Sequence, residues 1–323
     1  MHVPDHLLND PTELVAAVSA VAVVATTSAL GTRPARPAPA ATVLPNPDRA
    51  APQIAVAALV FALQMVNFPV LSGTSGHLLG GALATALIGP RRALLALAAV
   101  VASQALFFGD GGVAALGVNL WLIAILPVAV SSAAASLAQR RSGRTTAARL
   151  AVPAAAALVA PAVSAVAFSL LHGLAGTSTA GLGETVGPML RVHLAIGVGE
   201  AAITVAALAA VVAVPRVELA RVTPVATVWG LAVCSAAVLS TVASAHPDGL
   251  ERVATDLGLA ADGPTSILSG GPLQDYALSG VSGDAATSAA GLLGLALTSA
   301  AAIALLATYG AARAWVDVPK GTS

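Results

Sequence analysis

The chain has 323 residues, of which 57% are apolar and only 9% are charged, against about 25% charged residues in a typical soluble domain. Apolar runs long enough to cross a bilayer core of about 30 Å recur along it. This composition excludes a soluble two-domain enzyme, which length alone would favour, and predicts an all-α polytopic membrane protein. The formal net charge is zero, and no nucleic-acid partner is expected.

Nine apolar segments are predicted to cross the lipid bilayer as helices, with boundaries accurate to a few residues. In chain order they are 13–31, 52–70, 77–90, 91–108, 112–138, 150–172, 187–214, 225–244 and 287–309. The third follows the loop-like sequence VLSGTSG and has only 14 residues, so a re-entrant segment stays open in place of a complete span. The alternating ten-residue pattern of a transmembrane barrel does not occur.

The basic residues assign the ends of these segments to the two sides of the membrane. Thirteen of the 15 Lys and Arg residues fall on one side of the nine-span arrangement, and only Arg191 and Arg252 fall on the other. Basic loops stay in the cytoplasm, so the N-terminus is expected outside the cell and the C-terminus inside. Most acidic residues and all six histidines fall on the outer side, where a negative potential would concentrate cations.

Two regions without helical pattern divide the chain. Residues 31–52 are a Pro-rich predicted cytoplasmic linker, and residues 245–286 are a Gly-, Asp- and Pro-rich outer loop. The second region favours a seven-span domain over 1–215 and a separate module over 225–323. No Lys or Arg precedes Arg33, so the first apolar segment lacks the basic start of a signal peptide and is expected to remain as a span.

The chain begins MHVPDHLL, with a histidine directly after the first methionine. A free Met1 amine and the His2 amide nitrogen would close a five-membered ring on a metal ion. The same amide and the imidazole Nδ1 would close a six-membered ring. Three nitrogens in one plane suit Ni(II) or Cu(II) and leave a fourth position open. The alternative is that His2 is an ordinary interfacial histidine.

The second candidate segment is NFPVLSGTSGHLLGG, residues 67–81, which is also expected on the outer side. His77 follows a Gly- and Ser-rich loop and would lie near the membrane surface. It is a candidate fourth ligand for the planar chelate. The alternative is a histidine that only donates a hydrogen bond to a backbone carbonyl.

The third candidate segment is RVHLAIGVGEAAIT, residues 191–204. His193 and Glu200 are seven positions apart and therefore share one face of a helix. An ionisable residue inside a span is a functional candidate. The alternative is a structural polar cluster in which Glu200 bonds to Gln104 or Asn119.

Two classes of chemistry are excluded. The phosphate-binding motif GxxxxGK[ST] does not occur and Lys320 is the only lysine, so the chain is not expected to hydrolyse ATP by itself. Cys234 is the only cysteine, which excludes a disulfide framework and a cysteine metal site.

Together these segments resemble a known family. The sequences MHVPDHLL, NFPVLSGTSGHLLGGALATALIGPRRA, QALFFGDGG, LGVNLW and HLAIGVGEAAIT are similar, in this order, to the nickel/cobalt substrate-binding membrane component (CbiM/NikM type) of energy-coupling-factor ABC transporters. The similarity covers roughly residues 1–215. In the outer loop, HPDGLE (246–251) and GPLQDYALSG (271–280) resemble the PDGLE-type accessory module, which has two spans.

The resemblance implies a nickel or cobalt ion that is bound by Met1, His2 and His77 as a transported substrate and not as a cofactor. Supporting positions would be Asn67, Ser75, His193, Glu200 and His6. His6 stands where the family more often has a small residue. The implied partners are a transmembrane coupling subunit and two cytoplasmic ATP-binding subunits, in the cell membrane of a bacterium. No catalytic residue is expected, and the sequence does not separate nickel from cobalt, since both accept nitrogen donors.

Two other functions are alternatives to this one. A secondary carrier would use Glu200 as a proton relay, but the predicted spans lack paired acidic residues. An intramembrane serine protease would use Ser75 in the motif Gly73-Thr74-Ser75-Gly76, with His172 or His193 as the base. A four-residue motif occurs easily by chance.

Overall fold

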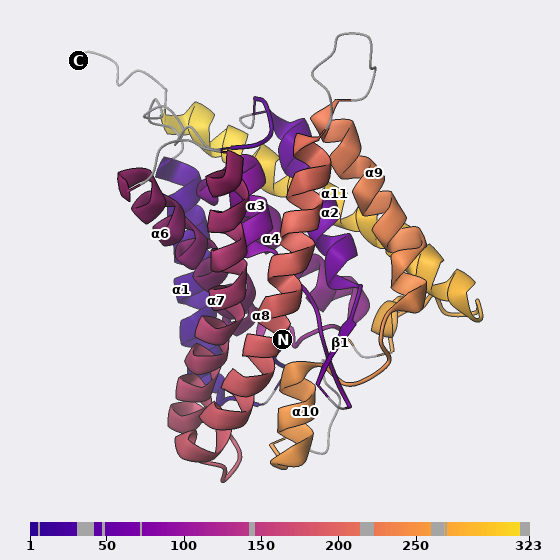
Figure 1. The fold of residues 1–323 in the computed structure, drawn as a ribbon. Helices are drawn as coiled ribbons and strands as arrows, with labels where there is room; N and C mark the ends of the chain where they lie inside the picture. Colours follow the sequence, from indigo (N-terminus) through magenta and orange to yellow (C-terminus); the bar gives the residue numbers. More distant parts are fainter. Residues whose placement is uncertain are drawn as a thin grey trace.

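The computed structural model describes residues 1–5, 7–30, 42–46, 49–71, 73–141, 146–213, 223–259, 268 and 270–316. Most of these residues are helical, and each of the nine predicted apolar segments contains a helix (Figure 1). This confirms the predicted mostly helical membrane fold. The described helices are α1 (Asp10–Leu30), α2 (Ala50–Gln64), α3 (Gly81–Ile88), α4 (Pro90–Ser103), α5 (Leu116–Asn119), α6 (Leu126–Arg141), α7 (Thr146–Ala175), α8 (Leu182–Val212), α9 (Pro224–Ala237), α10 (Gly249–Asp256) and α11 (Asp284–Val316).

Short irregular helices and one hairpin complete the described elements. The π-helix η1 (Gln104–Phe108) extends α4, and the π-helix η2 (Leu120–Ile125) joins α5 to α6. The 3-10 helices are η3 (Leu239–Val242) and η4 (Gln274–Tyr276). The strands β1 (Phe68–Leu71) and β2 (Thr74–Gly76) pair antiparallel.

Six helical segments of the described chain are long and apolar enough to cross a membrane. They are Asp10–Thr27, Pro90–Phe108, Leu116–Ala138, Ala147–Ala175, Leu182–Val212 and Asp284–Thr308. Helices α2 and α9 are apolar but shorter. Helix α3 has eight residues, about 12 Å at 1.5 Å per residue, which is too short to cross a core of about 30 Å alone. Its end is sharp because Gly89 has a φ of 82° and Pro90 then starts α4.

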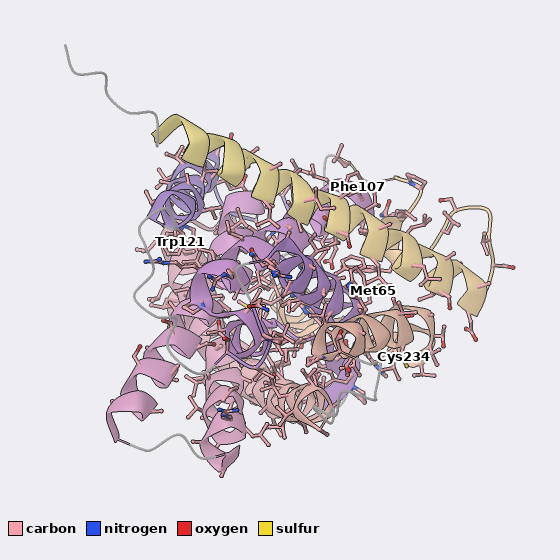
Figure 2. All side chains as sticks on the ribbon, turned by 90° about the horizontal axis from the view of Figure 1, so that it is seen from above. Met65, Phe107, Trp121 and Cys234 are labelled. Atoms are coloured by element: carbon pink, nitrogen blue, oxygen red, sulfur yellow. The ribbon has the colours of Figure 1, made fainter. Side chains whose placement is uncertain are left out.

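The C-terminal helices pack on the N-terminal ones. Helix α2 is buried on almost every side between α4, α9 and α11, while α7 and α8 form a long hairpin (Figure 1). Viewed from above, α11 lies along one side of the bundle (Figure 2). Cys234, labelled on α9 in that view, is exposed. The interior is therefore built from both sequence regions and not from two separate cores.

The predicted span 52–70 was wrong at its C-terminal end. Helix α2 ends at Gln64, and Phe68–Leu71 is strand β1, in which Phe68 lies opposite Gly76 and Pro69 lies opposite Ser75. Proline disfavours helical backbone in the residue before it, so Pro69 explains why Phe68 is extended. The hairpin lies with α10 at the lower end of the bundle in Figure 1.

Candidate metal-binding site

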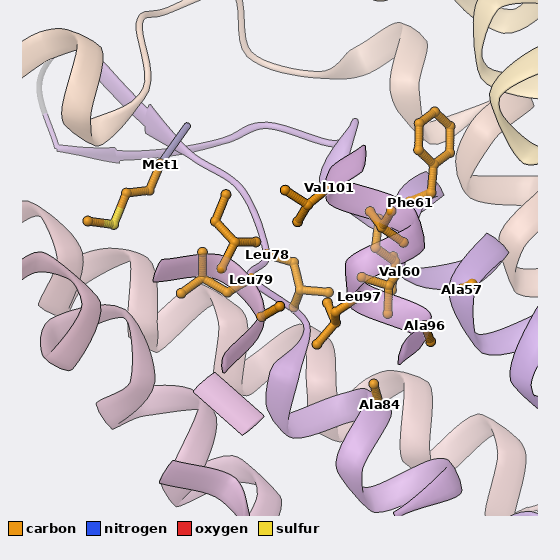
Figure 3. Close-up of a cluster of buried hydrophobic side chains, with 14 of the residues drawn as sticks. Met1, Ala57, Val60, Phe61, Leu78, Leu79, Ala84, Ala96, Leu97 and Val101 are labelled. Atoms are coloured by element: carbon orange, nitrogen blue, oxygen red, sulfur yellow. The ribbon is translucent and has the colours of Figure 1, made fainter. Parts of the chain in front are cut away.

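The N-terminal residues are held inside the protein. Met1 and Val3 are 3% and 0% exposed. Val3 N donates to Asn119 Oδ1 (2.7 Å), and Asn119 Nδ2 donates back to Val3 O (3.0 Å). Gly112 N donates to Val3 O, and a Cβ on Gly112 would lie only 1.9 Å from Asp5 Oδ1. The Met1 side chain lies beside Leu78 and Leu79 at one end of the buried apolar cluster (Figure 3). The position of the terminal amine is therefore fixed.

His77 faces that amine. The His77 Nδ1–H donates to Leu78 O (3.1 Å), so Nε2 carries the lone pair, and Nε2 is in direct contact with the Met1 amine. Burial, followed by the nearby charge of the N-terminal ammonium, lowers the pKa of His77. A neutral imidazole with a free Nε2 is the form that binds metals. The structure thus brings together two of the predicted donors.

His2 lies against the His77 ring, with ring centroids 5.1 Å apart and planes at 20°. Its Nδ1 is 3.0 Å from Asp110 Oδ1, and its Nε2 is 3.1 Å from Gln104 Oε1. Burial alone would raise the pKa of Asp110, but the charge of His2 and the hydrogen bond from it outweigh burial, and the pKa falls to about 2. The predicted ligand atom Nδ1 therefore faces a carboxylate here, and the ring must turn before Nδ1 can join the amine and amide nitrogens.

Tyr276 supports this arrangement from the far end of the sequence. Its hydroxyl donates to Asp110 Oδ2 (2.6 Å) and accepts from Gln104 Nε2 (3.0 Å). Burial and the neighbouring Asp110 charge raise the pKa of Tyr276 well above its ordinary value, so the phenol stays protonated and keeps donating. Gln104 also donates to Gln64 Oε1 (2.8 Å), which ties the cluster to the end of α2.

Asp248 is a residue of the site that the sequence reasoning missed. Its Oδ2 lies 2.8 Å from the Met1 amine and 3.5 Å from His77 Nε2. Burial alone would raise the pKa of Asp248, but the N-terminal ammonium and His77 hold it well below its usual range. The motif HPDGLE indicates the accessory module, and nothing in its sequence predicts contact with residues 1–2.

Side chains alone do not make a metal site in the described part of the chain. Among those residues, no group of three His, Cys, Asp or Glu side chains is placed to hold a metal ion. This leaves room for a site that uses main-chain nitrogens, as the predicted Met1–His2 chelate does. The metal-binding roles of Met1, His2 and His77 stay predictions.

Ser75 and Glu200 position the segments around the site. The Ser75 hydroxyl donates to His246 O (2.7 Å), and Ser75 N donates to Pro247 O (2.9 Å). It thus faces main-chain carbonyls and not a histidine base, which removes the geometric support for a serine protease. Glu200 is buried on α8, where its two carboxylate oxygens accept from Leu79 N (3.0 Å) and Gly80 N (3.1 Å). Its partners are these backbone groups and not Gln104 or Asn119.

The remaining predicted positions bond to the main chain or lie outside the described residues. His193 Nδ1 donates to Met189 O (2.8 Å), its Nε2 has no partner among the described residues, and its ring packs against Gly249. Ser244 N donates a hydrogen bond to the backbone oxygen of Asn67 (2.8 Å), so Asn67 joins the hairpin to the segment before α10. His6 lies outside the described residues.

Comparison with known proteins gives two family matches. Residues 2–217 match the family described as the cobalt uptake substrate-specific transmembrane region (CbiM), and residues 222–310 match the PDGLE domain. The fused nickel transport protein NikMN of Rhodobacter capsulatus is 39% identical over 85 residues, 26% of this chain and 24% of that protein. A protein of Archaeoglobus fulgidus that shares this name is 34% identical over 246 residues, 74% of this chain and 80% of that protein.

Solved structures agree on the fold. A crystal structure of a transition metal transporter superposes with a TM-score of 0.53 at 24% identity, covering 64% of this chain and 90% of the other. A truncated transition metal transporter gives a TM-score of 0.52 at 25% identity over 64% of this chain and 95% of the other. With the CbiM model matching two thirds of its length, the chain belongs to the CbiM family of transmembrane transport components, here joined to a PDGLE domain.

Proposed function

We propose that the chain captures Ni(II), or Co(II), outside the cell as the substrate-binding component of an importer. A separate coupling subunit and two ATP-hydrolysing subunits would drive release to the cytoplasm, because the sequence has no phosphate-binding loop of its own. The family match, the relatives named for nickel transport and the basic side assigned to the cytoplasm support this function. Residues 1–215 would form the capture domain and residues 225–323 its accessory module.

The observation that carries the proposal is the contact of the Met1 amine with His77 Nε2, inside a buried cluster of polar groups. The metal would replace one proton of the Met1 ammonium and the proton of the His2 amide. It would then be held by the Met1 amine, the His2 amide, the His2 imidazole and His77 Nε2. Four nitrogens in a plane favour a d8 ion such as Ni(II). The His2 ring would leave Asp110 as it turns toward the metal.

The proposal requires a free amine at Met1, so an N-terminal tag tests it. A tag of several residues without histidine moves the amine away from His77 and leaves His2 too far from the new terminus to share chelate rings with it. We expect the extended protein and the His2→Ala variant to lose high-affinity nickel binding. The same tag placed after Ser323 should leave binding unchanged. Metal bound by the purified protein, with nickel and cobalt offered together, is the measurement, and undiminished binding by the extended chain would refute the chelate.

A further inference from the structure

Asp248 does more than hold the accessory module in place. We propose that its Oδ2 is an oxygen donor to the captured cation, supplied by the PDGLE domain above the plane of nitrogen donors. This inference rests on the proposed function, because it assigns one more ligand to the same site. The site would then be completed by a residue outside the CbiM match.

The distance from the amine to Asp248 fits a shared coordination sphere. Two donors at right angles, each about 2.0–2.2 Å from a metal ion, lie about 2.8–3.1 Å from each other. Asp248 Oδ2 is 2.8 Å from the Met1 amine, within this range. It is 3.5 Å from His77 Nε2 and would have to approach the imidazole when a cation binds, while the two nitrogens are in direct contact. A cation bound between the two nitrogens would therefore have this carboxylate oxygen as its neighbour.

The carboxylate has one oxygen to spare for this role. Asp248 caps helix α10, and its Oδ1 accepts from Glu251 N (2.8 Å) in a capping box. That bond fixes the side chain and leaves Oδ2 directed at the amine. In the metal-free protein Oδ2 accepts a proton of the ammonium. Once the amine gives up that proton to bind the metal, the same negative charge faces the cation and stabilises it.

The main chain on both sides of Asp248 is fixed to the CbiM domain. Before it, His246 O and Pro247 O accept hydrogen bonds from Ser75, which is two positions from His77. After it, Gly249 packs so closely on α8 that a Cβ would lie 2.7 Å from Val192 Cγ1. A larger residue at this position would push Asp248 away from the amine. The sequence Asp-Gly is thus explained by packing as well as by the cap.

Asp248→Asn in the full-length protein tests the proposal. Asparagine caps helices as well as aspartate does, so the variant keeps α10 and removes the charge and the strong donor oxygen. With Ni(II) alone as the probe, we expect affinity to fall about tenfold or more, in the range seen when groups supporting a metal site are lost. The nickel X-ray absorption edge should also change, from a five-coordinate shape in the wild type to that of a square-planar site. Asp248→Ser, which also keeps a capping oxygen, should show the same losses if Asp248→Asn folds poorly.

Asp256→Asn is the matched control. Asp256 lies on the same helix, is exposed and pairs with Arg252 (2.9 Å), so its loss lowers the outer negative charge equally without reaching the site. We expect its nickel affinity to stay within about twofold of wild type. Equal affinity and an unchanged edge for Asp248→Asn, or an equal loss for Asp256→Asn, would overturn the donor role. Failure of the nitrogen chelate is read separately, from undiminished binding by the N-terminally extended protein.

Discussion

The bundle of long helices and the site layer at its end are built by different physical means. The site layer consists of residues 1–5, 66–80, 109–115, 244–256 and 270–280, where the described segments are mostly irregular. In the bundle, small and aliphatic side chains pack over long, locally regular stretches. In the site layer, polar groups from distant parts of the sequence bond in pairs, as Met1 does with Asp248.

This difference separates stability from function. A helix in the bundle gains its stability from many weak apolar contacts, so no single one defines the fold. The site layer depends on a few directed contacts, each of which sets the position of a candidate donor. Changes in the bundle should therefore lower the free energy of unfolding and leave metal affinity constant. Changes in the site layer should mainly lower metal affinity and affect the free energy of unfolding less.

His77→Ala should give the largest effect on affinity. It removes the Nε2 that contacts the Met1 amine and leaves three proposed nitrogens, so we expect nickel affinity to fall by about 100-fold or more, roughly 2.7 kcal/mol. The unfolding temperature should change less, because the ring contacts Leu78 O, the Met1 amine and the His2 ring, which belong to the site, and not the long helices of the bundle. Isothermal titration with nickel measures the first quantity and thermal unfolding in detergent measures the second.

His246→Ala is the control for that experiment. His246 is an exposed histidine of the same layer whose Nδ1 lies 3.0 Å from Ser244 Oγ. It should bind nickel as tightly as wild type. Equal losses for the two variants would mean that histidines of this layer bind nickel non-specifically, and the distinction between a built site and a polar surface would fail.

The bundle could be predicted from the sequence because its signal is local. Segments 150–172 and 187–214 were predicted from apolar length alone, and the helices found there are Thr146–Ala175 and Leu182–Val212. The prediction failed at segment ends, as where strand Phe68–Leu71 replaces the end of the span 52–70 and where α9 ends at Ala237 within the span 225–244.

The site could be predicted only in part. His2 and His77 stand out because histidine beside a free amine and histidine after a Gly-rich loop have known chemistry, and the resemblance joined them. Asp248 is 247 positions from Met1, and Tyr276 is 166 positions from Asp110. Acidic and aromatic residues are common in outer loops, so neither type indicates its partner. Such pairs depend on how the PDGLE domain packs on the CbiM domain, which local pattern does not contain.

Gly291→Ala should loosen the bundle and spare the site. Gly291 lies where α11 contacts α9, and a Cβ there would be 2.5 Å from Ala236 O. Because a backbone atom cannot move aside like a side chain, the helices must separate, at a cost of roughly 1–3 kcal/mol in the free energy of unfolding. Nickel affinity of the folded fraction should stay the same. Gly230→Ala on α9, where nothing lies within 4 Å of the new Cβ, should not destabilise the protein.

Acid should loosen the site layer of the metal-free protein before it affects the bundle. The pKa of Asp110 is lowered from 3.8 to about 2, so its ionised form is favoured by folding. This contribution is fully present above about pH 4 and is lost as the pH falls through about 2. The side chain is 28% exposed, which limits the contribution to about 1–2 kcal/mol. Unfolding free energies measured from pH 5 to 2 should fall less steeply for Asp110→Asn than for wild type, and parallel curves would contradict the assignment.

Ser75→Ala should give the smallest effect and the most specific one. The variant removes the hydroxyl that donates to His246 O and Pro247 O. It keeps the main-chain bonds from Ser75 N to Pro247 O and from Ser244 N to Asn67 O, so the hairpin stays joined to the segment before α10. Losing one such hydrogen bond costs about 0.5–1.5 kcal/mol, and we expect nickel affinity to fall a few-fold as Asp248 becomes less well placed. Ser136→Ala on α6, which removes an exposed hydroxyl bonded to Ser132 O, should leave affinity unchanged. In Asp248→Asn the Ser75 substitution should have no further effect on affinity, because its influence reaches the metal only through the carboxylate. Full additivity of the two changes would show instead that Ser75 acts on His77 directly, through strand β2.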